Sequence, residues 1–174
     1  MNAALKNKIK KIKLLIMDVD GVMTNGQIIV DDLGKETKIF DVQDGYGIVL
    51  FRDAGYKTAI ISARKTNAVT VRVNDLKINK VFQDAYPKTE AFNQVLKELG
   101  VSSQEVCFMG DDLPDLCILN RVGLAVAVAN AVSDVKKAAD YVTKRHGGQG
   151  AVREVIELIL KTQGKWDSIV KGNQ

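Results

Sequence analysis

Short apolar runs alternate with amphipathic stretches from residue 14 to the end of the chain, and this alternation limits the fold more than any other feature. Leu14–Val19 has the length and composition of a strand, and Lys57–Ser62 contains a second such run. Runs of this kind are typical of parallel strands that helices cover on both faces. Apolar residues repeat with helical spacing in Asp44–Asp53, between the two runs. The pattern predicts an α/β fold: a three-layer α/β/α, Rossmann-like parallel sheet.

The same patterns predict the remaining elements. Further strands are expected at Lys80–Phe82, Glu105–Met109, Leu124–Val128 and Tyr141–Thr143. Further helices are expected at Asn67–Leu76, Thr89–Leu99, Leu113–Asn120, Val132–Ala139 and Ala151–Lys161. Two β-prone segments, 27–30 and 37–40, flank a turn-forming stretch and predict a β-hairpin inserted after the first strand.

The chain has the length of one domain, at 174 residues. An apolar share of 46% is enough for a core and excludes a disordered protein. No internal repeat and no linker rich in proline, glycine or serine divides the sequence. We therefore expect residues 1–174 to form a single domain that includes the 27–40 hairpin and a C-terminal segment, 145–174.

Histidine and cysteine are scarce, and this limits the chemistry that the chain can carry out. A single histidine, His146, excludes a site with several histidine ligands within one chain. Two cysteines, Cys107 and Cys117, exclude a disulfide scaffold and a four-cysteine zinc site. If the protein is an enzyme, its acid and base groups must be mostly carboxylates and lysines.

Residues 6–13 carry five lysines, which raises the question of an anionic partner. No apolar run approaches the ~20 residues of a membrane helix, and no signal-peptide core follows the lysines. We interpret the run as a solvated first helical turn, with anionic lipid or nucleic acid as the weaker alternative. A net charge of +4 is too small to indicate nucleic acid. We expect a cytoplasmic protein without a nucleic-acid or membrane partner.

Polar side chains follow several of the predicted strands, at the edge of the sheet where ligands bind in α/β folds. They occur, in chain order, in Asp18-Val19-Asp20-Gly21, at Ser62, at Lys88 and in Gly110-Asp111-Asp112-Leu113-Pro114-Asp115. Carboxylates within ~5 Å of one another repel unless a cation joins them. Oxygen ligands without histidine or cysteine favour Mg²⁺.

A magnesium site beside a lysine and a serine is complementary to a phosphoryl group. One carboxylate of such a site can act as nucleophile and another as general acid and base. Each motif alone has a simpler interpretation. The Asp18–Gly21 motif also occurs in calcium loops, although Ile29 stands where an EF-hand has its last glutamate. Residues 111–115 suit a helix N-terminus. The order of all four motifs favours the site.

This ordered set of motifs resembles the haloacid dehalogenase superfamily of phosphohydrolases, over nearly the whole chain. The resemblance implies Asp18 as the nucleophile and Asp20 as the general acid and base. It implies Ser62 and Lys88 as the groups that hold the phosphate. Phosphatases of the superfamily carry an aspartate where this chain has Asp20, and this favours hydrolysis of phosphate esters. Ala63 stands where many members have glycine.

The resemblance also implies a Mg²⁺ site. Asp18, the backbone carbonyl of Asp20 and Asp111 would bind the ion directly. Asp115 would hold it through water, and Asp112 would assist. Larger members cover the site with a cap domain, but residues 21–61 and 63–87 leave no room for one. We therefore expect a capless fold, and the glycine-rich residues 147–150 are a mobile or tightly turning segment suited to cover the site.

Residues 18–26, 110–115 and 140–154 are similar to those of the 3-deoxy-D-manno-octulosonate 8-phosphate phosphatase family. This narrower resemblance implies Mg²⁺-dependent hydrolysis of a small sugar-acid phosphate in lipopolysaccharide precursor synthesis. It also implies a homotetramer in which hairpins like 27–40 pack together. Arg64 and Arg153 are the candidates for binding the substrate carboxylate, since arginine binds carboxylates in a bidentate manner. Surface or intersubunit ion pairs are the alternative for both.

Three other functions remain open at this point. Phosphatases for nine-carbon, sialic-acid-like sugars share the capless pattern, but tend to have an acidic residue where Arg64 stands. A non-catalytic oligomerising module would be expected to have lost Asp18, Asp20, Lys88 or Asp111, and none is lost. A receiver domain lacks an acid two residues after its phosphorylated aspartate.

Overall fold

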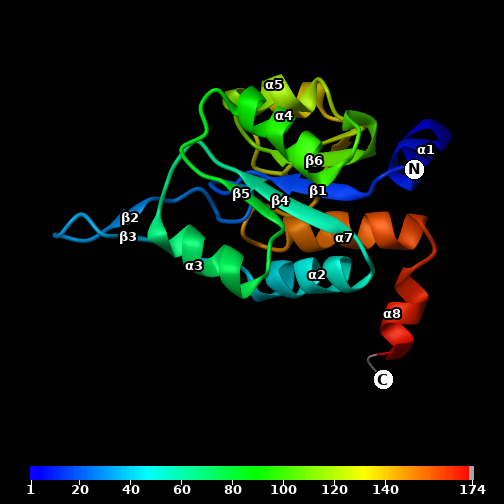
Figure 1. Cartoon of the computed structure of the whole chain (residues 1–174), viewed down its shortest axis with the longest axis horizontal. Coiled ribbons are helices and arrows are strands. Elements are labelled where there is room, and N and C mark those ends of the chain that lie inside the picture. Colours follow the sequence, from blue (N-terminus) through cyan, green and yellow to red (C-terminus); the bar gives the residue numbers. More distant parts are fainter. Residues whose placement is uncertain (173–174) are drawn as a thin grey trace.

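A computed structural model describes residues 1–172 of the chain as a parallel sheet between two layers of helices (Figure 1). The main sheet has six strands in the order β5-β4-β1-β6-β7-β8, and every neighbouring pair is parallel. Its strands are β1 (Leu14–Met17), β4 (Lys57–Ile61), β5 (Lys80–Phe82), β6 (Val106–Gly110), β7 (Leu124–Ala127) and β8 (Tyr141–Val142). The predicted three-layer α/β/α fold is confirmed.

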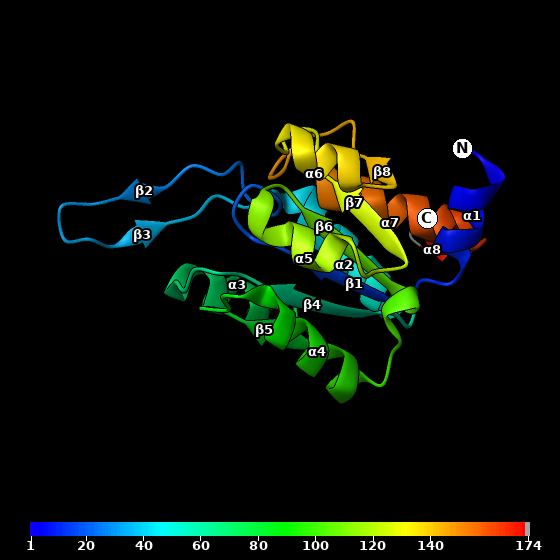
Figure 2. The ribbon, with the colours of Figure 1, turned by 90° about the horizontal axis from the view of Figure 1, so that it is seen from above.

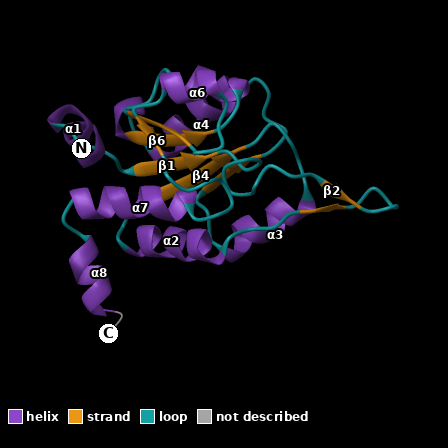
Figure 3. Cartoon of the chain, turned by 180° about the vertical axis from the view of Figure 1, so that it is seen from behind, coloured by secondary structure: helices purple, strands orange, loops and turns teal. Residues whose placement is uncertain are grey.

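The helices divide between the two faces of the sheet. On one face lie α2 (Val42–Asp53), α3 (Asn67–Asp75) and α7 (Ala151–Thr162) (Figure 3). On the other lie α4 (Lys88–Leu99), α5 (Leu116–Leu119) and α6 (Ser133–Ala138). Two further helices, α1 (Ala3–Lys10) and α8 (Trp166–Gly172), pack near the ends of the chain. None of the helices in residues 1–172 is both long and apolar enough to cross a membrane.

The core forms because helices cover both faces of the central strands. All four residues of β1 are fully buried, as the unbroken apolar run predicts. The opposite layers contribute Phe51 from α2 and Phe92 from α4, and both rings are fully buried. Burial of a large apolar side chain stabilises a fold by about 1.5–3 kcal/mol. The core therefore holds the carboxyl ends of the strands in fixed relative positions.

Side-chain caps explain where two helices begin. The Asp41 carboxylate accepts hydrogen bonds from the backbone N–H groups of Gln43 and Asp44, at 2.7 and 3.1 Å, so α2 begins before the predicted Asp44. The predicted helix Leu113–Asn120 is instead a 3₁₀ turn, Leu113–Asp115, followed by α5. The Asp115 carboxylate folds back onto the backbone N–H of Asp111, and this tightens the first turn.

The predicted hairpin is present, but its ladder is shorter than expected. Only β2 (Ile29–Val30) and β3 (Glu36–Thr37) pair, with Ile29 opposite Thr37. Directly after β3, Lys38 turns inward and pairs with Asp20, which follows β1. The hairpin projects away from the sheet and helices (Figure 2).

Candidate active site

A cavity of about 250 Å³ lies at the carboxyl ends of the strands, where the strand order reverses between β1 and β6. Ligands of open α/β sheets bind at this switch point. The lining contains every predicted site residue except Arg153: Asp18, Asp20, Ser62, Arg64, Lys88, Asp111, Asp112 and Asp115. The structure thus brings together groups from four separate strand ends, as the sequence predicts.

Lys88 joins two of the carboxylates. Its Nζ lies 2.8 Å from Asp18 Oδ1 and 2.6 Å from Asp115 Oδ1. Lys88 is the first residue of α4 and is 3% exposed, and Asp115 is 1% exposed. Burial alone would lower the pKa of Lys88, but the Asp18 and Asp115 carboxylates outweigh it and raise that pKa. The ammonium group therefore stays charged and fixes the position of Asp18.

Asp18, Asp111 and Asp115 form a cluster whose carboxylate oxygens lie within 4.8 Å of one another. Burial, with added repulsion from Asp18 and Asp115, raises the pKa of Asp111 to about 8. Burial also raises the pKa of Asp18 to about 6, against the opposing effect of Lys88. Lys88 supplies one positive charge for three carboxylates, so the cluster needs a further cation. An all-oxygen donor set favours a hard divalent ion such as Mg²⁺.

The residues present therefore fit a magnesium ion. Asp18 and Asp111 would hold it, and Asp115, expected to act through water, lies in the same cluster. When bound, the ion supplies charge neutralisation to the phosphoryl oxygens. Gly21 makes the approach of Asp111 possible. Its φ is +89°, and a Cβ there would lie 2.0 Å from Asp111 Oδ2. Any other residue at this position would displace the loop after β1 or the Asp111 carboxylate.

We expect Mg²⁺ to stabilise the protein more at about pH 8.5 than at about pH 6, because protonated carboxylates release the ion. The raised pKa values of Asp18 and Asp111 mean that the metal-free folded protein binds protons more tightly than the unfolded chain does. Metal-free stability should therefore fall as the pH rises from about 4 to about 8. Thermal melts with Mg²⁺ and with matched NaCl test this. The prediction would be contradicted if Mg²⁺ raised the melting temperature equally at both pH values. It would also be contradicted if Mg²⁺ raised the melting temperature of Asp111→Asn as much as that of the native protein.

Asp20 lies in a second group of charges, one that the sequence analysis missed. Lys38 Nζ lies 2.5 Å from Asp20 Oδ1 and 2.7 Å from Glu36 Oε1, and its side chain is 1% exposed. Asp20 Oδ2 is buried and accepts no hydrogen bond from residues 1–172, and Arg64 Nε lies 3.8 Å from it. Lys38 thus orients Asp20 and leaves one carboxylate oxygen for proton transfer. No motif marks residues 36–38, so only the fold reveals them.

Ser62 and Arg64 lie together at the end of β4. Ser62 is 2% exposed, and its Oγ accepts a hydrogen bond from the backbone N–H of Arg64 at 3.2 Å. The hydroxyl hydrogen is thus left to donate into the cavity. The Arg64 guanidinium is half exposed and is bound to Glu36 at 2.9 Å. This places a cation at the mouth of the cavity, where a substrate carboxylate would compete with Glu36.

Two of the predicted residues have other contacts. Asp112 Oδ1 accepts a hydrogen bond from the backbone N–H of Leu113 at 2.7 Å. This contact agrees with the alternative interpretation of residues 111–115 as a helix N-terminus. Arg153 lies outside the lining of the cavity. Its Nε pairs with Glu157 at 2.8 Å, and its guanidinium lies 5.3 Å from the centre of the Trp166 ring. Within this chain, Arg153 therefore holds α8 against α7 and does not face the candidate site.

The glycine-rich residues 147–150 turn tightly and pack against the loop after β1. Asn130 Nδ2 donates to the Gly21 carbonyl at 3.0 Å, and Asn130 Oδ1 accepts from the Gly147 N–H at 2.7 Å. The Gly148 N–H donates to the Val22 carbonyl at 3.0 Å. Within this chain, the segment holds the loop after β1 in place through these hydrogen bonds. Asn130 is another residue that the sequence analysis missed, since a lone asparagine carries no signal.

We expect Gly147→Ala to lower activity by about tenfold or more, because small displacements of a catalytic loop have such effects. A Cβ at Gly147 would lie 1.7 Å from the Gly21 carbonyl oxygen, so the loop that follows Asp20 must move. Gly172→Ala is the control, because a Cβ there meets nothing within 4 Å. Initial rates at saturating substrate measure the effect. Equal rates for the two variants would contradict the supporting role of this segment.

Comparison with known proteins agrees with this geometry. A family model described as haloacid dehalogenase-like hydrolase matches residues 31–156. The chain belongs to this family. The match confirms the superfamily inferred from the motifs. Only the hairpin and α2 lie between β1 and β4, and only α3 and β5 lie between β4 and α4, so residues 1–172 of this haloacid dehalogenase-like hydrolase contain no cap domain.

Relatives of this haloacid dehalogenase-like hydrolase include two named 3-deoxy-D-manno-octulosonate 8-phosphate phosphatases. The one from Escherichia coli K12 is 44% identical over 160 residues, covering 92% of this chain and 85% of that relative. The one from Haemophilus influenzae is 39% identical, covering 92% and 89%. A crystal structure of the Moraxella catarrhalis phosphatase with magnesium ion, phosphate ion and KDO is 40% identical, with a TM-score of 0.95 and 98% of both chains covered.

Proposed function

We propose that this protein hydrolyses 3-deoxy-D-manno-octulosonate 8-phosphate, with Mg²⁺, to the free sugar acid and phosphate. One observation carries the chemistry: at the switch point of the sheet, Asp18 lies 2.8 Å from the Lys88 ammonium and within 4.8 Å of the Asp111 and Asp115 carboxylates. The relatives of that name, alike over nearly the whole chain, support the substrate. The same features argue against a non-catalytic module.

The reaction proceeds in two steps through a covalent intermediate. An Asp18 oxygen attacks phosphorus, the ester P–O bond breaks, and Asp20 gives its proton to the departing sugar oxygen. Water then attacks the aspartyl-phosphate while Asp20 takes up the water proton. The bond between phosphorus and Asp18 breaks and phosphate leaves. Ser62 and Lys88 hold the phosphoryl oxygens throughout, and Lys88 also offsets the charge of Asp18.

A phosphate-release assay on the eight-carbon and nine-carbon sugar phosphates tests the substrate. We expect kcat/KM to be at least about tenfold higher for the eight-carbon compound, and activity to require Mg²⁺. Preference for the nine-carbon compound would replace the proposed substrate and keep the chemistry. Hydrolysis of neither compound would overturn the proposal.

Arg64 is the proposed contact of the substrate carboxylate. Hydrogen bonds to charged groups contribute about 1.5–3 kcal/mol, so Arg64→Gln should raise KM about tenfold or more for the sugar-acid phosphate. KM for p-nitrophenyl phosphate, which has no carboxylate, should stay nearly constant. The exposed neighbour Lys65 supplies the control Lys65→Gln. An equal rise in KM for both substrates would indicate that Arg64 acts on the phosphate group or on Asp20, and not on the substrate carboxylate.

We further propose that the protein is a homotetramer assembled through the hairpin. The hairpin exposes five apolar side chains to solvent: Ile28, Ile29, Val30, Leu33 and Ile39. Contiguous apolar surface of this kind marks an interaction site. Light scattering should give four times the chain mass of 19.1 kDa for the native protein and a smaller species for Ile29→Lys/Val30→Lys. Asp32→Lys, in the same hairpin, should remain tetrameric.

The domain organisation and location complete the proposal. We propose that the chain works as one phosphatase domain, because a single cluster of buried apolar residues joins β1, β4, β6 and β7, and partly buried residues of β5 and β8 pack against it. The substrate proposed here implies that it acts in the cytoplasm. The last two residues of the predicted C-terminal segment, 145–174, lie outside the described residues.

A further inference from the structure

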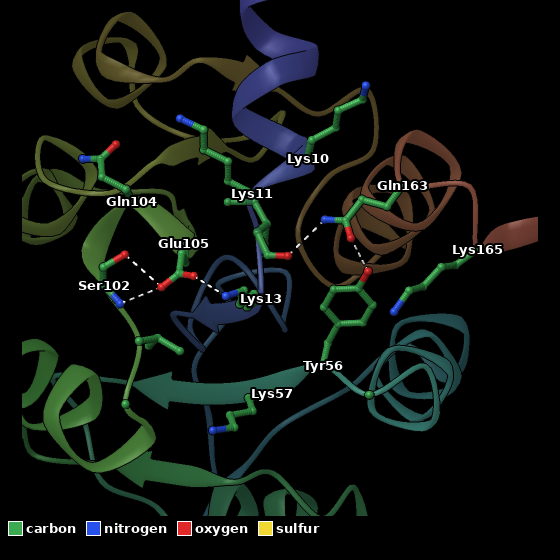
Figure 4. A pocket seen from close by; sticks show the side chains of 14 residues that line it. Lys10, Lys11, Lys13, Tyr56, Lys57, Ser102, Gln104, Glu105, Gln163 and Lys165 are labelled. Atoms are coloured by element: carbon green, nitrogen blue, oxygen red, sulfur yellow. Dashed lines mark hydrogen bonds and ion pairs between the residues drawn. The ribbon is translucent and has the colours of Figure 1, made fainter.

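A second and larger cavity lies at the opposite edge of the sheet. It has a volume of about 830 Å³ and is lined by residues that precede β1, β4 and β6, by the end of α1, and by the segment between α7 and α8 (Figure 4). These are the amino ends of the same strands whose carboxyl ends form the active site. Four residues of β1 separate the two cavities, roughly 13 Å of strand.

The lining of this cavity is strongly basic. It contains five lysines, namely Lys10, Lys11, Lys13, Lys57 and Lys165. Its one acidic residue is Glu105, so the lining has a formal charge of +4. The whole chain also has a formal charge of +4, and the rest of the molecule is therefore neutral on balance. The excess positive charge of the protein is concentrated here rather than spread over its surface.

Most of these ammonium groups have no carboxylate partner. Lys13 pairs with Glu105 at 2.5 Å, and this uses the one acid of the lining. Lys57 donates to the Leu99 carbonyl at 2.8 Å and Lys165 to the Ala54 carbonyl at 3.0 Å, and neither acceptor is charged.

The two lysines at the end of α1 are freer still. Lys10 and Lys11 are exposed, and no carboxylate of residues 1–172 lies within 4.0 Å of either amine. Figure 4 shows their side chains extending in different directions from the end of α1, with Lys13 beside Glu105 and Lys165 directed toward Tyr56. The cavity is thus surrounded by ammonium groups that come from three parts of the chain.

We propose that this cavity binds a small anion that carries several phosphate groups, an oligophosphate or a nucleotide. Unpartnered like charges repel, and an anion that contacts several of them at once relieves that repulsion. A single phosphate reaches few of the lysines, whereas a chain of phosphates reaches amines on opposite sides. The concave shape disfavours a flat membrane surface. Gln104, which lines the cavity beside the lysines, adds an uncharged polar group.

The test is a calorimetric titration of the full chain with sodium tripolyphosphate, without Mg²⁺ and at about 50 mM salt, where screening is modest. Orthophosphate and ATP are titrated in parallel. The variant Lys10→Gln/Lys11→Gln removes two amines of the rim. Lys136→Gln/Lys137→Gln is the matched control, because it also removes two adjacent lysines at the end of a helix, α6, outside the cavity.

We expect tripolyphosphate to bind the native protein at least about tenfold more tightly than orthophosphate, and Lys10→Gln/Lys11→Gln to weaken it about tenfold. The control should bind as the native protein does, and both variants should keep full phosphatase activity. Tighter binding of ATP than of tripolyphosphate would identify a nucleotide as the ligand. Equal binding by all three proteins would overturn the proposal. The proposal would also be overturned if Lys10→Gln/Lys11→Gln lost binding to anionic phospholipid vesicles but kept its affinity for tripolyphosphate.

Discussion

Asp18→Asn is expected to lower phosphate release by at least about 1,000-fold, because it removes the proposed nucleophile and not merely a contact to the substrate. The fold should remain intact. The substitution removes one of three clustered carboxylates, and the pKa of Asp111 is raised partly by Asp18. The metal-free variant should therefore melt no lower than the native protein. Single-turnover phosphate release and circular dichroism melts measure the two effects.

Asp112→Asn is the matched control for this prediction. It makes the same change of charge in the same cavity, but at an exposed carboxylate that caps the turn at Leu113. Asparagine caps equally well, so activity should remain within a few-fold. Rapid turnover by Asp18→Asn would show that Asp18 is not the nucleophile. Comparable losses in the two variants would instead point to a general effect of charge on metal binding.

Lys88→Met is expected to have the largest effect on stability. The substitution leaves the Asp18 and Asp115 carboxylates buried without their ammonium partner. Removal of one member of a buried ion pair costs about 3–5 kcal/mol. The free energy of unfolding in urea, measured without Mg²⁺, should fall by about that amount. Activity should fall as well, because Lys88 is also proposed to hold the phosphoryl group.

A second variant separates loss of charge balance from loss of packing. Lys88→Met/Asp115→Asn removes one negative charge together with the positive one, and it should recover part of the lost stability without recovering activity. Mg²⁺ should also stabilise Lys88→Met more than it stabilises the native protein. If the double variant is as unstable as Lys88→Met, the cost comes from packing around the lysine stem instead.

The alternation of strands and helices was enough to predict the fold, because each buried strand is an unbroken apolar run. The strand Lys80–Phe82 has the predicted bounds, and the predicted three-layer fold around a parallel sheet is confirmed. The site could be located for a related reason. Parallel strands bring their carboxyl ends to one edge, so residues such as Asp18 and Asp111 meet even though they are far apart in the chain.

Contacts that depend on side-chain direction could not be predicted in this way. The burial of Lys38 against Asp20 follows from where the hairpin ladder stops, and no local pattern marks that point. Asn130 acts through the meeting of two loops. Arg153 was a reasonable candidate by residue type, but its place on α7 turns it toward Trp166. The catalytic roles themselves remain predictions that the variants above test.

The support that residues 147–150 give to the loop after β1 has a consequence for synthesis of the protein. The ribosome makes Asp18 and Asp20 before it makes the residues that hold their loop. The hydrogen bonds that hold this loop come from Asn130, Gly147 and Gly148, which lie much later in the sequence. A nascent chain therefore exposes its catalytic motifs long before it can act on a substrate. Activity should begin only when the chain as far as Gly148 has left the exit tunnel and folded.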